Sequence, residues 1–139
     1  MKLVCISDTH SLHRHIPEVP DGDVLIHAGD GLGQGTLEDI EDLNDWLGML
    51  PHRHKVVIAG NHDWAFQETP ELAREALTNA VYLEDSSVEI EGIRFWGSPW
   101  TPTFMDWAFM LERGEPNRCI RNGSSFQTTP MCSSDRKST

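Results

Sequence analysis

The chain has 139 residues, which suits a single domain, and its net charge of −11 argues against basic patches that hold duplex nucleic acid or an anionic membrane surface. No apolar run approaches the roughly 20 residues of a membrane span, and we expect no secretory leader before the first strand. Three widely spaced cysteines form no disulfide framework, so we expect a cytoplasmic protein.

Short apolar runs bounded by glycine, proline and asparagine predict the strands. We expect strands at residues 2–7, 23–28, 55–59 and 81–83, in that order. Cys5 lies within the first run, and we expect it to be buried. The runs 87–90 and 93–97 flank Glu91-Gly92, which predicts a hairpin.

Two segments between these strands predict helices. Thr36 can cap a helix over 36–50, with Asp39 at the capping-box position. Thr69-Pro70 opens a second segment that ends near Asn79. Strands that alternate with helices and then lead into a hairpin are typical of a layered α/β fold.

Polar motifs follow three of the predicted strands. They are Asp8-Thr9-His10, Gly29-Asp30 and Gly60-Asn61-His62-Asp63. Open α/β sheets place ligands at strand ends, and carboxylate, imidazole and amide oxygen suit divalent metals. Each motif alone is a weak signal, and the third is compatible with an ordinary turn. The three in order, each after an apolar run, favour a metal site.

Each residue type predicts a role at such a site. Asp8 and His10 are two residues apart and can point to the same side. Asp30 can bridge two ions through its two oxygens, and Asn61 offers an amide oxygen to the second ion. Two ions of this kind clamp a phosphate and activate a water.

The two residues after Asn61 suggest how a proton could reach the leaving group. His62 can protonate the leaving oxygen as a general acid. Asp63 can orient His62 by accepting its other N–H. The remaining histidines suggest less: we expect His27 to be a hydrogen-bonded core residue, and His13 either touches substrate or lies on the surface.

These motifs resemble the first three motifs of the calcineurin-like metallophosphoesterases. The segments 95–100 (Phe-Trp-Gly-Ser-Pro-Trp) and 106–109 (Asp-Trp-Ala-Phe) further resemble the small metallophosphoesterase domain-containing subgroup. The resemblance covers residues 1–116. It implies an α/β/β/α sandwich with two divalent metal ions (manganese, iron or zinc) that hydrolyses phosphoesters. Phosphodiesters are the expected substrates, and nucleotides are among the candidates.

The same resemblance implies a set of site residues. Asp8, His10 and Asp30 would hold the first metal, Asp30 and Asn61 the second, and His62 would protonate the leaving group. Trp96, Trp100 and Trp107 either wall the pocket and stack on a nucleobase or pack in the core.

The chain departs from the family pattern after this point. The pattern includes a later Gly-His and a Gly-His-x-His, whereas the last histidine here is His62. The net charge is −14 up to Pro116 and +3 over 117–139, which sum to −11. We therefore expect 1–116 to be the N-terminal part of the domain and 117–139 to be an atypical, disordered tail, with a frameshift or aberrant gene end as its hypothetical origin.

A domain shortened in this way would have two consequences. The second metal would keep only two protein ligands and bind weakly. The sheet would present an unpaired edge, so we expect self-association. The leading hypothesis is an impaired metallophosphoesterase with a small phosphoester substrate. The alternatives are an inactive metal- or nucleotide-binding remnant and a serine/threonine protein phosphatase.

Overall fold

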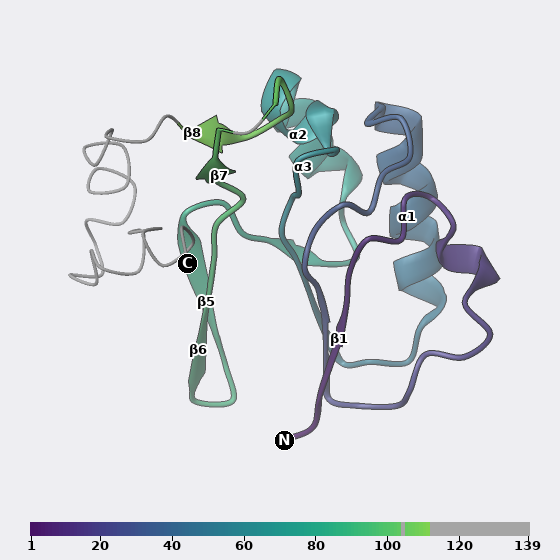
Figure 1. The fold of residues 1–139 in the computed structure, drawn as a ribbon. Coiled ribbons are helices and arrows are strands. Elements are labelled where there is room, and N and C mark those ends of the chain that lie inside the picture. The colour runs from purple at the N-terminus through teal and green to yellow at the C-terminus, as the bar shows by residue number, and fades with distance from the viewer. Residues whose placement is uncertain (104, 112–139) are drawn as a thin grey trace.

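A four-stranded parallel sheet forms the centre of the computed structural model, which describes residues 1–103 and 105–111 (Figure 1). Its strands run in the order β1 (Leu3–Ile6), β2 (Val24–His27), β3 (His54–Val57) and β4 (Val81–Tyr82). Because all four are parallel, their carboxyl ends share one edge of the sheet. The predicted strands and the α/β class are confirmed, while the tail expected over 117–139 lies outside the described residues.

Helices cover one face of this sheet (Figure 1). They are α1 (Leu37–Met49), α2 (Trp64–Glu68) and α3 (Pro70–Ala76), and a short 3-10 helix, η1 (His13–His15), lies beside α1. The predicted capping box of α1 is present: the Thr36 hydroxyl accepts from the Asp39 amide, and the Asp39 carboxylate accepts from the Thr36 amide. None of these helices is long and apolar enough to span a membrane.

The second predicted helix begins where expected but ends earlier. It begins at Pro70 but ends at Ala76, before Asn79, and a further helix, α2, precedes it. Thr69 separates α2 from α3 with φ −132° and ψ 63°. A residue before proline is sterically disfavoured in the helical region, which explains the break.

The predicted hairpin lies on the face of the sheet opposite the helices (Figure 1). It consists of β5 (Ser86–Ile90) and β6 (Ile93–Gly97), paired antiparallel. A small core joins it to the sheet through Val24, Val56, Leu83 and Ile90. Two short strands, β7 (Thr101–Pro102) and β8 (Met110–Leu111), then pair in parallel. The described residues thus form three layers: helices, parallel sheet and hairpin.

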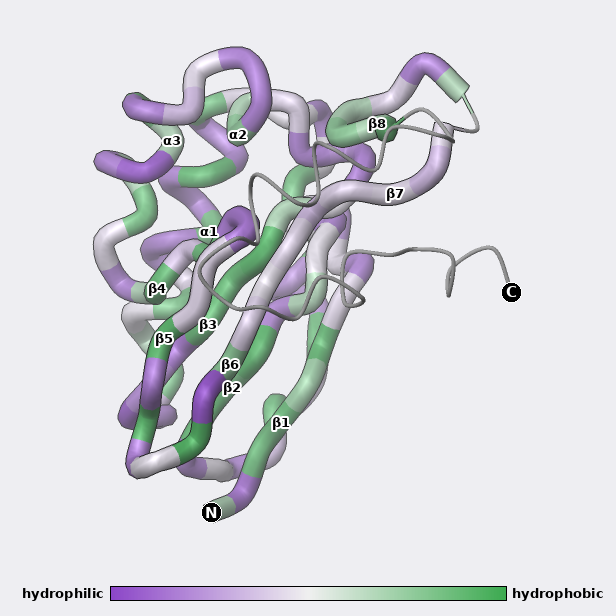
Figure 2. The backbone as a smooth tube through the Cα atoms, turned by 90° about the vertical axis from the view of Figure 1, so that its left-hand side faces the viewer, coloured by the Kyte–Doolittle hydropathy of each residue, from purple (hydrophilic) through white to green (hydrophobic). Residues whose placement is uncertain are grey.

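The expectation that Cys5 is buried is wrong, because the hairpin does not cover β1. Cys5 is exposed and Leu3 is 45% exposed, although Val4 between them is buried. Val24, the partner of Leu3 on β2, contacts the hairpin core. Figure 2 shows β1 as a hydrophobic strand at the edge of the sheet. Its face away from the helices is therefore open in the described part of the chain.

Candidate metal centre

The three polar motifs meet at the carboxyl edge of the parallel sheet. Asp8 follows β1, Asp30 follows β2, and Asn61 follows β3. Backbone hydrogen bonds join the first two loops: the Asp8 amide donates to the Gly29 carbonyl at 2.9 Å, and the His10 amide donates to the Asp30 carbonyl at 3.0 Å. The topology therefore brings residues from three distant parts of the sequence together, as their spacing predicted.

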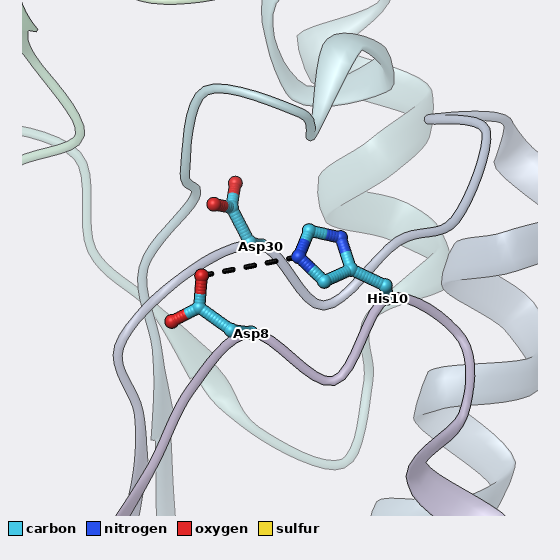
Figure 3. Close-up of side chains that lie close together, drawn as sticks. All are labelled: Asp8, His10 and Asp30. Carbon is cyan, nitrogen blue, oxygen red and sulfur yellow. Dashed lines mark ion pairs between the residues drawn. The ribbon is translucent and has the colours of Figure 1, made fainter.

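Asp8, His10 and Asp30 form a cluster of ligand atoms, each within 4.8 Å of the others (Figure 3). The Nε2 atom of His10 is 3.9 Å from Oδ1 of Asp8. Figure 3 shows the three side chains converging from the loops after β1 and β2. Two carboxylates and one imidazole can hold a divalent cation of the manganese, iron or zinc type.

The backbone at this cluster has an uncommon conformation. The φ angles of Asp8, His10 and Asp30 are 56°, 43° and 56°, all in the left-handed region. Residues other than glycine enter this region at an energetic cost, although aspartate and histidine tolerate it better than most. Three such residues in one cluster are typical of a functional site, where surrounding contacts hold the strained geometry.

Asn61 presents an unsatisfied acceptor. Its Oδ1 atom is buried and has no hydrogen-bond partner among the described residues, whereas its backbone carbonyl accepts from the Ala108 amide at 3.0 Å. A buried polar atom without a partner costs about 1–3 kcal/mol. A cation coordinated by Oδ1 would remove that cost, so Asn61 fits the metal ligand role that the sequence predicted.

Asp63 has a carboxylate that joins the second motif to the third. Oδ2 accepts from the backbone amides of Gly60, Asp30 and Gly31 at 2.8, 2.9 and 3.3 Å, and Oδ1 accepts from Leu32 at 3.0 Å. The side chain is 2% exposed. Burial raises the pKa of Asp63, and the hydrogen bonds from Gly60 and Leu32 oppose that rise.

These four bonds assign Asp63 a structural task that its sequence position did not reveal. They hold the Asp30 loop against the loop that carries Asn61, so the placement of both candidate ligands depends on one carboxylate. The predicted role of Asp63 in orienting the His62 ring stays a prediction.

His62 lies directly beside the cluster. Its backbone amide donates to Oδ1 of Asp30 at 2.9 Å. Its ring centroid lies 5.2 Å from that of His10, with the rings nearly perpendicular, and 5.1 Å from that of Trp107. A proton donor at this place suits the general acid that the sequence predicted.

Two other histidines have structural partners. The ring of His27 is buried, with Nε2 2.9 Å from the Thr9 hydroxyl, and burial lowers its pKa to about 4. The expectation of a hydrogen-bonded core histidine is confirmed. His13 is not a surface residue: it is fully buried, and Nε2 lies 2.8 Å from Asp42. It is buried because η1 packs against α1, and no periodicity in the sequence indicated that contact.

Comparison with known proteins supports the assignment of these motifs. Residues 1–116 match the family model described as calcineurin-like phosphoesterase. The chain is 41% identical to human metallophosphoesterase domain-containing protein 1 over 137 residues, which covers 82% of this chain and 42% of the human protein. It is 40% identical to a UPF0046 protein of Caenorhabditis elegans over 131 residues, which covers 83% of this chain and 46% of that protein.

The chain therefore spans less than half the length of these curated relatives. The family match nevertheless includes all three motifs and every residue of the candidate metal centre. The matching region, the parallel sheet and the convergence of the motifs at its carboxyl edge agree with one another, and the chain belongs to the calcineurin-like phosphoesterase family.

Proposed function

We propose that this chain carries the metal-binding half of a phosphodiesterase that uses two divalent ions. The observation that carries the proposal is the convergence of Asp8, His10 and Asp30 at one edge of the sheet. Asn61 follows β3 at the same edge, and its buried Oδ1 has no hydrogen-bond partner among the described residues. The family and the names of its relatives support phosphoester hydrolysis. A small diester, such as a cyclic nucleotide, is the proposed substrate.

The described residues supply an unequal set of ligands. Asp8, His10 and Asp30 would hold the first ion, and Asp30 with Asn61 the second. Bound ions would polarise the phosphoryl oxygens and lower the pKa of a water. We propose that the second ion binds more weakly than the first, because it has fewer candidate ligands among the described residues. Manganese suits both the carboxylates and the imidazole.

The chain's own residues would orient the general acid and provide the proton for the leaving oxygen. Asp30 fixes the backbone of His62 through its amide, which places the imidazole next to the ligand cluster. From there His62 would donate its proton to the leaving oxygen. The competing proposal is a binding module without turnover, which the small number of ligands among the described residues favours.

Hydrolysis of bis(p-nitrophenyl) phosphate by the purified chain with added manganese tests the proposal. We expect turnover that depends on the metal. For a dialkyl phosphate, whose alkoxide leaving group needs a proton, we expect the rate to fall about 10²- to 10⁴-fold in His62→Ala. His54→Ala is the matched control, because His54 lies at the opposite end of β3 from the site. A folded chain that binds manganese without turnover would instead support the binding module.

We also propose that the chain self-associates through β1. This strand is an edge of the parallel sheet, and Leu3 and Cys5 are exposed on its open face. An open apolar edge strand is a common site of pairing with another chain. The exposed thiol of Cys5 suits a reducing compartment, and we propose the cytoplasm.

Sedimentation velocity tests the association. We expect the wild-type chain to sediment as a dimer or larger species and Leu3→Lys to shift it toward the monomer, because a lysine on an edge strand opposes pairing. Leu72→Lys is the control, since Leu72 is 51% exposed on α3, away from this edge. A wild-type chain that sediments only as a monomer would contradict the proposal.

A further inference from the structure

Two aromatic rings contact the His62 imidazole. The first belongs to His10, a candidate metal ligand, with ring centroids 5.2 Å apart and the planes at 86°. The second belongs to Trp107, with centroids 5.1 Å apart and the planes at 39°. The rings come from segments far apart in the sequence, because His10 follows β1 and Trp107 precedes β8. The imidazole is therefore held by packing from both ends of the described chain.

The backbone next to Trp107 is anchored to the third motif. The Ala108 amide donates to the carbonyl of Asn61 at 3.0 Å, and the Phe109 amide donates to the Gln67 side chain. Ala108 is fully buried and Phe109 is 1% exposed. These contacts place the indole beside His62 as part of the folded structure, not as an incidental surface contact.

A second aromatic contact supports this segment from the side of the hairpin. Trp100 makes an edge contact with Phe109 at 5.2 Å, and its Nε1 donates to Asp85 at 2.8 Å. The Thr101 amide donates to the Phe109 carbonyl at 3.1 Å. The segment 107–109 is thus fixed both to the loop that carries His62 and to the chain that follows the hairpin.

We propose that Trp107 is a positioning residue that holds the His62 imidazole in the orientation needed to protonate the leaving oxygen. The inference rests on the proposed role of His62 as general acid. The backbone of His62 is fixed by Asp30, but its side chain can still rotate about two bonds. Packing against a tilted indole face favours one rotamer several-fold over the others.

The proton transfer makes this orientation matter for some substrates more than for others. Hydroxide forms a bond to phosphorus while the bond to the leaving oxygen breaks. The leaving oxygen keeps the electron pair and takes the proton of the His62 imidazolium, which becomes neutral. An alkoxide needs that proton, whereas p-nitrophenolate leaves readily without it. Loss of Trp107 should therefore slow alkyl diesters far more than nitrophenyl diesters.

Proton NMR of the metal-free chain tests the packing without any need for turnover. The signals of the His62 ring are identified by their loss in His62→Ala. We expect Trp107→Ala to shift them clearly, because the indole ring current is removed, and Trp107→Phe to keep much of the wild-type shift. Trp107→Leu retains apolar bulk without an indole, and we expect it to behave like Trp107→Ala. Phe95→Leu is the control, because Phe95 lies on β6 and packs against the core between hairpin and sheet, and it should leave them unchanged. His62 signals that do not move in Trp107→Ala would overturn the proposal.

Kinetics with manganese test the role in proton donation. We expect Trp107→Ala to lower kcat about 10-fold for a dialkyl phosphate, with little change for bis(p-nitrophenyl) phosphate or in KM. The double variant His62→Ala/Trp107→Ala should match His62→Ala alone, because the indole acts through the imidazole. Equal losses on both substrates, or losses that add to those of His62→Ala, would overturn the proposal. A wild-type chain without turnover would contradict the proposed function, and the NMR result would still decide whether Trp107 holds His62.

Discussion

Replacing Asp63 with asparagine should lower the free energy of unfolding by about 3 kcal/mol and weaken manganese binding at least 10-fold. The carboxylate accepts four backbone amides, from Asp30, Gly31, Leu32 and Gly60. An amide side chain offers one acceptor oxygen, and its NH₂ group faces N–H donors that remain buried. The loops that carry the metal ligands should then separate.

Urea denaturation and calorimetric titration with manganese measure these two effects. The matched control is Asp45→Asn, because Asp45 is exposed on α1 and the same chemical change there should alter neither quantity by much. Manganese affinity in Asp63→Asn equal to that of the control would show that the carboxylate does not hold the site together. Neither unfolding nor manganese binding depends on proton transfer by His62, so both measurements report on the structural task of Asp63. The effect of His62→Ala on turnover reports on the proton transfer by itself.

Replacing Gly60 with alanine should abolish measurable metal binding. A Cβ atom at this position would lie 2.5 Å from the backbone nitrogen of Asp30 and would also meet its carboxylate. Backbone cannot give way as a flexible side chain can, so the loops after β2 and β3 must move apart. We expect a loss of about 3 kcal/mol in stability and at least a 100-fold loss in manganese affinity.

Gly92→Ala controls for the general effect of removing a glycine. Gly92 has φ 82° in the turn between β5 and β6, so alanine there is strained, but nothing lies within 4 Å of its added Cβ. Both variants should unfold more easily, and only Gly60→Ala should lose the metal. Equal manganese affinity in the two variants would contradict the close approach of Gly60 to Asp30 as a requirement of the site.

Local patterns in the sequence determined the main elements and the candidate ligand set. The apolar runs predicted the parallel strands, Thr36 and Asp39 predicted the capped start of α1, and Glu91-Gly92 predicted the hairpin. The motif that contains Asp8 and His10 could be predicted because its residues are close neighbours in the sequence and directly follow an apolar run. Strand ends of a parallel sheet meet at one edge, so the cluster with Asp30 followed from topology alone.

The tertiary structure decided which of these residues support one another. Only packing shows that the Asp63 carboxylate binds the amides of another loop, or that Trp107 lies against His62, 45 residues earlier in the numbering. Such contacts depend on long-range placement, which leaves no period or spacing in the sequence. The exposure of Cys5 has the same origin, because an apolar strand is buried only where another layer covers it, and the hairpin stops short of β1.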